Sequence, residues 1–162
     1  MPDDLCQTDR DRDPYAWAVA QAALIAKGDA AIQRLDLAGL KRLLEEVAED
    51  ILSTLRSQLV NLMAHAAKVA HSTNPAVIGH WRTECAEFHD RIIDVYRPSM
   101  RRKLDLEALW RRARRKVLAS FADYGEPSPV LPAKCPFSLD ELIDEDLDVE
   151  HLAASLRAAG KI

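Results

Sequence analysis

Hydrophobic residues recur mostly every three or four positions between Leu40 and Val69. That spacing places them on one face of an α-helix. The segment contains neither glycine nor proline, and Asp36, just before it, can cap the first helical N–H groups. The pattern predicts one helix from about Leu37 to about His71, roughly 50 Å long at the usual rise per residue. Its hydrophobic positions are Leu40, Leu44, Val47, Ile51, Leu55, Leu59, Leu62 and Val69.

Capping residues also predict a helix before this long one. Asp13 has a side chain that accepts an N–H group at a helix start, and the ring of Pro14 fits the first helical turn. These two residues predict a helix over residues 15–27. Gly28 then suits the left-handed position that commonly follows a helix.

The second half of the chain carries the same kind of signals. Asn74 stands before a proline and begins a third helix. Asp105 and Gly125 bracket a fourth amphipathic helix. Ser138 opens a capping box, with a glutamate three residues later, and this predicts a short helix. Asp148 begins the last helix.

These elements predict an all-α fold, namely a helical bundle of four main helices with two short C-terminal helices. Prolines between residues 126 and 137 predict an extended connector that lies on the bundle. The polar residues 1–12 predict a disordered or flexible N-terminus. The remaining residues, 13–162, have the length of one domain, so we expect a single all-helical domain there.

The first helix is unusual because nearly all of its residues are hydrophobic. Gln21 is the one polar residue between positions 15 and 26, whereas a surface helix normally has a polar face. Such a helix must be covered on all sides, and a chain of this length has little room for a central helix. We therefore expect a homodimer with Tyr15, Trp17, Gln21 and Leu24 in its interface. Aromatic residues are common interface anchors, although an ordinary core is the alternative.

Charge and cysteine content narrow the function classes. The net charge of −4 gives ordinary solubility and disfavours a general nucleic-acid binder. The cysteines form no CxxC pair, so neither a zinc site nor a disulfide framework is indicated. The N-terminus lacks the pattern of a signal peptide, and no apolar run is long enough to span a membrane. We expect a cytoplasmic protein with no membrane contact, no cofactor and no metal.

A series of short motifs is typical of one bacterial family. The motifs are Tyr15-Ala-Trp17 with Gln21 and Gly28, then Leu35-Asp36, His65-Ala-Ala-Lys68, Trp81-Arg82, Pro98-Ser99 and Cys135-Pro136-Phe137. Over residues 13–147 the chain resembles the family called domain of unknown function 29. The resemblance implies an all-helical bundle and a bacterial origin. It implies no chemistry, because that family has no established activity.

The chain departs from this family at one place. Relatives usually carry an acidic pair early in the second helix, whereas an ungapped alignment puts Arg42 and Leu43 there. The nearest acidic pair is Glu45 and Glu46, three residues later. We interpret this as loss or displacement of the family's acidic pair.

Four residues form a candidate ligand site on the second and third helices. His65 and Lys68 are three residues apart and share a helix face, and Trp81 and Arg82 lie on the next helix. Cationic side chains grouped in this way are typical of a site for a phosphate or carboxylate. The alternative is a histidine at the core edge, with the lysine extending to solvent.

The fourth helix carries a basic stripe, and the C-terminal segment is acidic. Residues 140–150 include seven acidic residues and no lysine or arginine. We expect this segment to lie against the basic helix of its own chain or of a second subunit, and phosphate binding is the alternative use of the stripe. The stripe consists of Arg111, Arg112, Arg114, Arg115 and Lys116.

The sequence leaves the biochemical function unknown. The favoured interpretation is a non-catalytic cytosolic protein-interaction module that self-associates and binds an unknown protein partner. The first alternative is nucleic-acid binding through the arginine-rich helix 105–124, which the net charge disfavours. The second is an enzyme or anion-binding protein with a pocket near His65 and Trp81.

Overall fold

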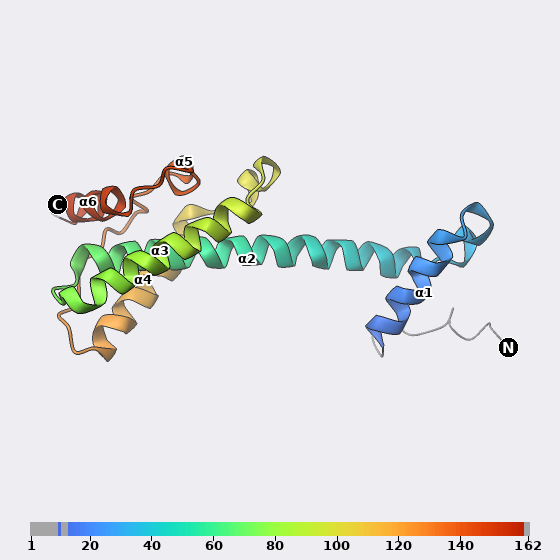
Figure 1. Cartoon of the computed structure of the whole chain (residues 1–162), viewed down its shortest axis with the longest axis horizontal. Helices are drawn as coiled ribbons and strands as arrows, with labels where there is room; N and C mark the ends of the chain where they lie inside the picture. Colours follow the sequence, from blue (N-terminus) through green and yellow to red (C-terminus); the bar gives the residue numbers. More distant parts are fainter. Residues whose placement is uncertain (1–9, 11–12, 161–162) are drawn as a thin grey trace. The chain divides into compact units, whose positions relative to one another are not determined.

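The computed structural model describes Arg10 and residues 13–160, and every regular element in that part of the chain is a helix (Figure 1). The predicted all-α fold class is confirmed. Apart from Arg10, the segment predicted to be flexible, residues 1–12, lies outside the described residues. Within the described ranges, no helix combines the length and the hydrophobicity that a membrane-spanning segment needs.

The chain forms two compact units, and the boundary between them falls inside one helix. The N-terminal unit ends at Glu49, and the C-terminal unit begins at Asp50. Helix α2, Leu37–His71, contributes its first turns to the N-terminal unit and the rest to the C-terminal unit. The single domain expected for residues 13–162 stays a prediction, because compactness within each unit does not show whether the two fold together.

The N-terminal unit contains α1, the 3₁₀ helix η2 and the first turns of α2. Helix α1, Pro14–Ala26, begins where the Asp13 side chain accepts the Ala16 N–H at 2.9 Å. Gly28 follows with a φ of 71°, in the region that favours glycine. Both ends of α1 therefore agree with the predicted signals. The 3₁₀ helix η2, Asp29–Arg34, was not predicted.

The helices of the C-terminal unit begin at the predicted caps. Asn74, Asp105, Ser138 and Asp148 each accept a backbone N–H with their side chain at a helix start. Ser138 forms the complete capping box that its sequence context predicted. The 3₁₀ helix η3 was not predicted. The elements are α3 Pro75–Val95, η3 Pro98–Lys103, α4 Leu106–Asp123, α5 Leu139–Leu142 and α6 Val149–Ala159.

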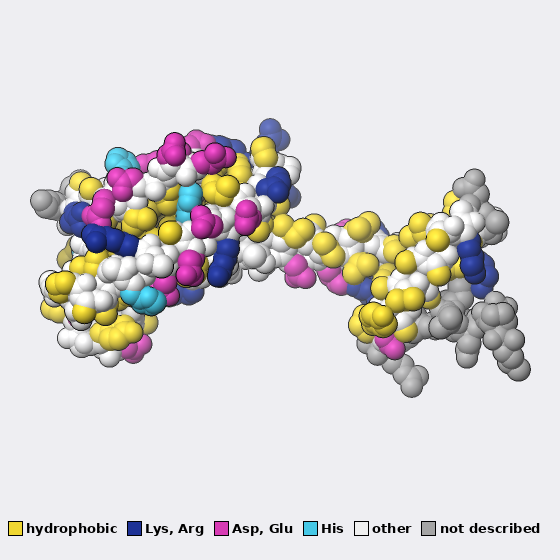
Figure 2. All heavy atoms as spheres, viewed as in Figure 1, with side chains coloured by type: hydrophobic (Ala, Val, Ile, Leu, Met, Phe, Trp, Pro, Cys, Tyr) yellow, Lys and Arg dark blue, Asp and Glu magenta, His cyan; other side chains and the backbone are white. Residues whose placement is uncertain are grey.

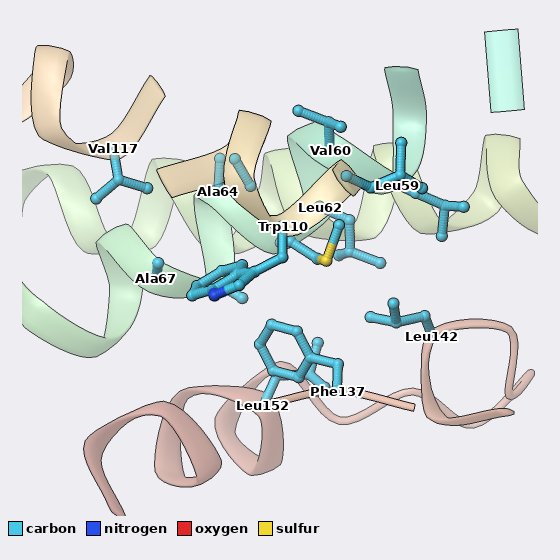
Figure 3. Close-up of a cluster of buried hydrophobic side chains, with 14 of the residues drawn as sticks. Leu59, Val60, Leu62, Ala64, Ala67, Trp110, Val117, Phe137, Leu142 and Leu152 are labelled. Carbon is cyan, nitrogen blue, oxygen red and sulfur yellow. The ribbon is translucent and has the colours of Figure 1, made fainter. Parts of the chain in front are cut away.

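A hydrophobic core fills the C-terminal unit. Leu59 and Leu62 of α2 and Trp110 of α4 are completely buried in it. Trp110 faces Phe137 (Figure 3), and the two rings meet edge to face with their centroids 5.8 Å apart. The Trp110 indole N–H donates to the Pro132 carbonyl oxygen at 2.9 Å. The proline-bearing connector thus packs against α4 and covers the core.

Candidate interaction surface

Three of the four residues predicted for a dimer interface lie inside the N-terminal unit. Trp17, Gln21 and Leu24 are 3%, 2% and 5% exposed, whereas Tyr15 is 81% exposed. Gln21 is buried because its side-chain oxygen accepts the Asp36 backbone N–H at 2.9 Å. The predicted interface is corrected at these three positions, because their side chains are already buried within the N-terminal unit of their own chain.

Asp36 joins α1 to α2 through both of its carboxylate oxygens. Oδ2 accepts the indole N–H of Trp17 at 3.2 Å, and Oδ1 caps α2 by accepting the Gly39 N–H at 2.8 Å. The bond from Gly39 is the main cause that lowers the pKa of Asp36 from its ordinary value. The carboxylate is therefore ionised at neutral pH, and charge assists both hydrogen bonds.

Gly39 allows the indole ring of Trp17 to approach the backbone of α2. A Cβ atom at this position would lie 2.8 Å from Cζ2 of Trp17 and would also clash with the Asp36 carboxylate. Gly39 was not among the site residues predicted from the sequence. The sequence did contain a signal for its role, because Gly39 lies in the first turn of the predicted helix and is the only glycine in that helix.

The opposite side of α1 is hydrophobic and exposed. Tyr15, Val19 and Ile25 are 81%, 54% and 58% exposed, and no charged residue occurs in α1. Figure 2 shows hydrophobic side chains along the visible side of this helix, which is blue in Figure 1. The N-terminal unit therefore covers one side of α1 and leaves the other side in water.

The first turns of α2 add a second exposed hydrophobic row. Leu37, Leu44 and Val47 are exposed, and Leu40 between them is half-buried. Their steps of three and four residues are those by which one helix packs against another. We use the term apolar surface for the exposed large hydrophobic residues of the N-terminal unit, which are Tyr15, Val19, Ile25, Ile32, Leu37, Leu44 and Val47.

The N-terminal unit has little hydrophobic interior in its described part. Its buried hydrophobic residues are Trp17, Ala20, Leu24 and Ala31. Both clusters of buried hydrophobic side chains found in residues 13–160 belong to the C-terminal unit, with Leu55 as their first member. The described part of the N-terminal unit therefore contributes little hydrophobic burial to the stability of that unit.

The candidate ligand site centres on a residue that was not predicted to belong to it, Glu84. His65 Nε2 lies 3.0 Å from Glu84 Oε2, and His65 Nδ1 lies 2.9 Å from the Asn61 carbonyl oxygen. Lys68 Nζ lies 5.4 Å from the centroid of the Trp81 ring, a cation–π contact. The structure therefore brings His65, Lys68 and Trp81 together around a carboxylate.

Burial sets the protonation of this polar cluster. It is the main cause that lowers the pKa of His65 and of Lys68 from their ordinary values. The Asn61 carbonyl and the Glu84 carboxylate favour a protonated His65, yet desolvation and the nearby Lys68 charge outweigh them. The lowered pKa makes His65 a weaker base than an ordinary histidine, which reduces the positive charge that the anion site was predicted to offer.

Arg82 does not join this cluster. Its Nε donates to Glu150 Oε1 of α6 at 2.7 Å, so its guanidinium is engaged with a carboxylate elsewhere. The prediction of a converging four-residue site is corrected, because adjacent positions on a helix point about 100° apart. Among the described histidine, cysteine and acidic side chains, no group of three could hold a metal ion.

The basic stripe of α4 is largely exposed. Arg111, Arg112, Arg115 and Lys116 are exposed, and Arg114 is half-buried at the edge of the core with Nε lacking a described hydrogen-bond partner. Lys116 Nζ donates to the side-chain oxygen of Asn61 of α2 at 2.7 Å. Lys116 is thus engaged with α2, and the other exposed residues of the stripe are three arginines.

The acidic C-terminal segment pairs with other basic residues. Asp140 makes two hydrogen bonds of 2.8 Å with Arg101, and Glu150 pairs with Arg82 and Arg157. No ion pair within residues 13–160 joins the segment 140–150 to the stripe 111–116. The expectation that the chain's own acidic segment covers the stripe is wrong, because the segment lies against η3 and α3 instead.

The sequence matches the family described as domain of unknown function DUF29 over residues 10–148. The chain belongs to this family. The match includes residues of both units of the DUF29 protein and ends where α6 begins. The suspected family is thus confirmed.

The fold of this DUF29 protein is also that of a solved structure. The crystal structure of an α-helical protein of unknown function from Rhodospirillum rubrum is similar with a TM-score of 0.71 and 22% sequence identity, over 91% of this chain and 97% of that chain. No curated protein matches the chain. The function of the DUF29 protein is therefore unknown, and any proposal rests on its own residues.

The acidic pair of the DUF29 protein takes part in surface ion pairs. Glu45 lies 3.6 Å from Lys41, one turn earlier on α2. Glu46 pairs with Arg10, whose guanidinium also lies 5.6 Å from the centroid of the Trp17 ring. The pair therefore contacts basic residues of the N-terminal unit, and Glu46 helps to hold the chain before α1 against α2.

Proposed function

We propose that this DUF29 protein is a non-catalytic interaction module that forms a homodimer through its apolar surface. The observation that carries the proposal is the exposure of large hydrophobic residues such as Tyr15 and Leu44 in a unit that buries few of its own. Contiguous exposed hydrophobic surface marks interaction sites on proteins. An unknown protein partner then binds the dimer.

Dimer formation would give the N-terminal unit the interior that it lacks. A large hydrophobic side chain contributes about 1.5–3 kcal/mol when it becomes fully buried. Burying Tyr15, Val19 and Leu44 in a dimer interface therefore helps to offset the free-energy cost of the translational and rotational freedom that is lost on association. The outer face of α1 and the row on α2 are both uncharged, so no like charges oppose a second copy there.

The bacterial cytoplasm is the compartment that we propose for the dimer. Cys85 is a buried free thiol, and Cys135 is a half-buried free thiol. Unpaired cysteines are typical of proteins in a reducing compartment. Burial also raises the pKa of the Cys85 thiol to about 12, which makes it unreactive and argues against a catalytic role for it.

Light scattering coupled to size-exclusion chromatography tests the dimer. The chain has a mass of 18.1 kDa, and we expect the measured mass at micromolar concentration to be twice this value. Leu44→Glu and Val47→Glu should yield monomers, because they place charge at the centre of the apolar surface. Val130→Glu is the control, since Val130 is an exposed hydrophobic residue of the C-terminal unit. A monomeric wild type, or equal dissociation by the control, contradicts the proposal.

Nucleic-acid binding through α4 is a second candidate function. The observation that favours it is the exposed set of Arg111, Arg112 and Arg115, which forms no ion pair with the described acidic segment. Fluorescence anisotropy with duplex DNA at low salt tests it, with the three arginines changed to glutamate. Loss of binding supports this function, and unchanged or absent binding rejects it. Arg91→Glu, on α3, is the matched control.

The remaining alternative, an enzyme or anion-binding protein near His65 and Trp81, gains no support from the geometry. Glu84 occupies the centre of that cluster, and Arg82 is directed to Glu150. A carboxylate among the cations repels an anion, so this alternative is not proposed.

A further inference from the structure

One side of α4 consists of arginines and alanines only. Successive residues of an α-helix point about 100° apart, so a sector of roughly 100° collects residues from several turns of this helix. Three exposed arginines occupy the middle of the sector along the axis, and alanines stand at both ends, two of them exposed. We use the term arginine face for this sector, which consists of Ala108, Arg111, Arg112, Arg115, Ala119 and Ala122.

The acidic residues of α4 are confined to its two ends. Residues 108–122 contain no aspartate or glutamate, and Asp123 is the last residue of the helix. Glu107, one turn before Arg111, is already engaged, because both of its side-chain oxygens accept the Cys135 backbone N–H, each at 3.1 Å. The arginine face therefore carries positive charge that no acidic residue of α4 is placed to neutralise.

The charges of the arginine face repel one another. Arg111 and Arg115 are four residues apart, and Arg112 and Arg115 are three apart, and like charges at these spacings destabilise a helix. Among the described side chains, none of the three arginines is held in an ion pair. A bound polyanion would remove this repulsion.

Positive charge continues into the segment before α4. Residues 101–116 include eight lysines and arginines and two acidic residues. Arg102 and Lys103, at the end of η3, are exposed, whereas Arg101 is paired with Asp140. A positive surface of this length suits a polymer with regularly spaced phosphates better than it suits one small anion.

We propose that α4 enters the major groove of duplex DNA with its arginine face toward the base edges. This inference rests on the second candidate function, nucleic-acid binding through α4, and names the form of nucleic acid and the groove. The major groove of B-DNA is about 12 Å wide and admits an α-helix. Alanines at both ends of the face keep the helix slim there, so its backbone can approach the base pairs. The guanidinium of an arginine can then donate two hydrogen bonds to O6 and N7 of a guanine.

Fluorescence anisotropy with the full chain at low salt tests the groove. The probes are a short DNA duplex, the RNA duplex of the same sequence, and the same DNA with glucosylated hydroxymethylcytosine in place of cytosine. The major groove of duplex RNA is too narrow for protein side chains to read, and the glucose groups fill the major groove of the modified DNA without changing its phosphates. We expect both of these duplexes to bind at least about tenfold more weakly than the unmodified DNA.

The other outcomes of this experiment overturn the proposal in distinguishable ways. Equal binding of the three duplexes would show contacts with phosphates alone, which overturns insertion into the groove and leaves nucleic-acid binding intact. Binding of none of them rejects nucleic-acid binding as well. Displacement of the unmodified DNA by poly-glutamate at an equal concentration of charge would identify an acidic protein as the partner of α4 and would also overturn the proposal.

Two pairs of variants locate the contact on α4. Arg115→Gln should weaken binding of the unmodified DNA by about five- to 150-fold, the range for one bidentate base contact, whereas Arg91→Gln on the exposed side of α3 should leave it unchanged. Ala119→Trp fills the arginine face without changing its charge and should remove the preference for unmodified DNA over duplex RNA. Ala86→Trp, at an exposed position of α3, is the matched control. Equal effects within either pair contradict the proposal.

The dimer variant separates this inference from the proposed dimer. Leu44→Glu changes the N-terminal unit, whereas α4 belongs to the C-terminal unit. Each copy of the chain carries its own α4, so Leu44→Glu should keep the preference for unmodified DNA over duplex RNA. The two proposals can therefore fail independently.

Discussion

Helix α2 meets opposite surroundings in the two units. In the C-terminal unit, Leu59 and Leu62 are completely buried, whereas in the N-terminal unit Leu44 is 69% exposed on the same helix. The hydrophobic pattern in the sequence is equally clear in both places. A hydrophobic row on a helix thus shows that a surface needs covering, and it does not show which element covers it.

The difference lies in the number of elements that pack around α2. In the C-terminal unit, α4 and the connector contribute Trp110 and Phe137 to one core with the leucines of α2. In the N-terminal unit, α1 packs on α2 through Trp17, Asp36 and Gly39, and it leaves the row with Leu44 uncovered. A second copy of the chain would supply the missing layer.

The largest expected difference between the units concerns their tryptophans. We expect Trp110→Ala to lower the free energy of unfolding by about 3–5 kcal/mol, because it empties a completely buried site. Trp17→Ala should instead lower the protection of α1 amides in hydrogen exchange, with a smaller effect on the global transition. Urea denaturation and hydrogen exchange measure the two effects, and equal global losses would contradict the comparison.

Replacing a glycine by alanine should change stability by an intermediate amount, with opposite signs in the two units. Gly39→Ala should destabilise the N-terminal unit by about 1–3 kcal/mol, the usual cost of forcing an extra group into a packed contact, because its Cβ meets Trp17. Gly79→Ala is the control on α3, where nothing lies within 4 Å. It should stabilise the helix by about 0.5–1 kcal/mol. Thermal unfolding measures both, and a harmless Gly39→Ala would refute the close contact.

A smaller difference between the two units is expected from their helix caps. Asp13 and Asp105 accept equivalent N–H groups, at 2.9 and 3.0 Å, at the starts of α1 and α4. Asp105→Ala should lower the free energy of global unfolding by about 1 kcal/mol. Asp13→Ala should mainly lower the protection of the α1 amides from hydrogen exchange. The prediction fails if both changes shift the denaturation midpoint equally.

The smallest expected effect is a pH dependence confined to the C-terminal unit. Burial lowers the pKa of His65 and of His71 from the ordinary value of 6.5. A base whose pKa is lowered by folding stabilises the protein above its unfolded-state pKa and loses that contribution as the pH falls. The free energy of unfolding should therefore decrease between about pH 7 and pH 5, and His65→Gln should reduce the slope. An unchanged slope in this variant would exclude His65 as a contributor.

Local signals predicted the helix starts well. Asp13 with Pro14 and the capping box at Ser138 are found where the sequence placed them. Each cap depends on a few neighbouring backbone groups, so the chain segment itself contains the information. The 3₁₀ helices η2 and η3 were missed, because such short elements carry no hydrophobic periodicity.

The candidate sites were predicted less completely. The pairing of Gln21 with the Asp36 backbone and of Arg82 with Glu150 joins residues that no motif connects. Side-chain partners across elements depend on which faces meet, and a single sequence carries no direct record of that.

The sequence alone determined the helices, their caps and the hydrophobic rows, because these depend on backbone geometry and on spacing within one segment. Only the tertiary structure decided that Trp17, Gln21 and Leu24 face inward while Tyr15 faces water. Both sides of α1 are hydrophobic, so its own composition cannot distinguish them. The choice is made by Gly39 and Asp36, which let one side of α1 pack against α2.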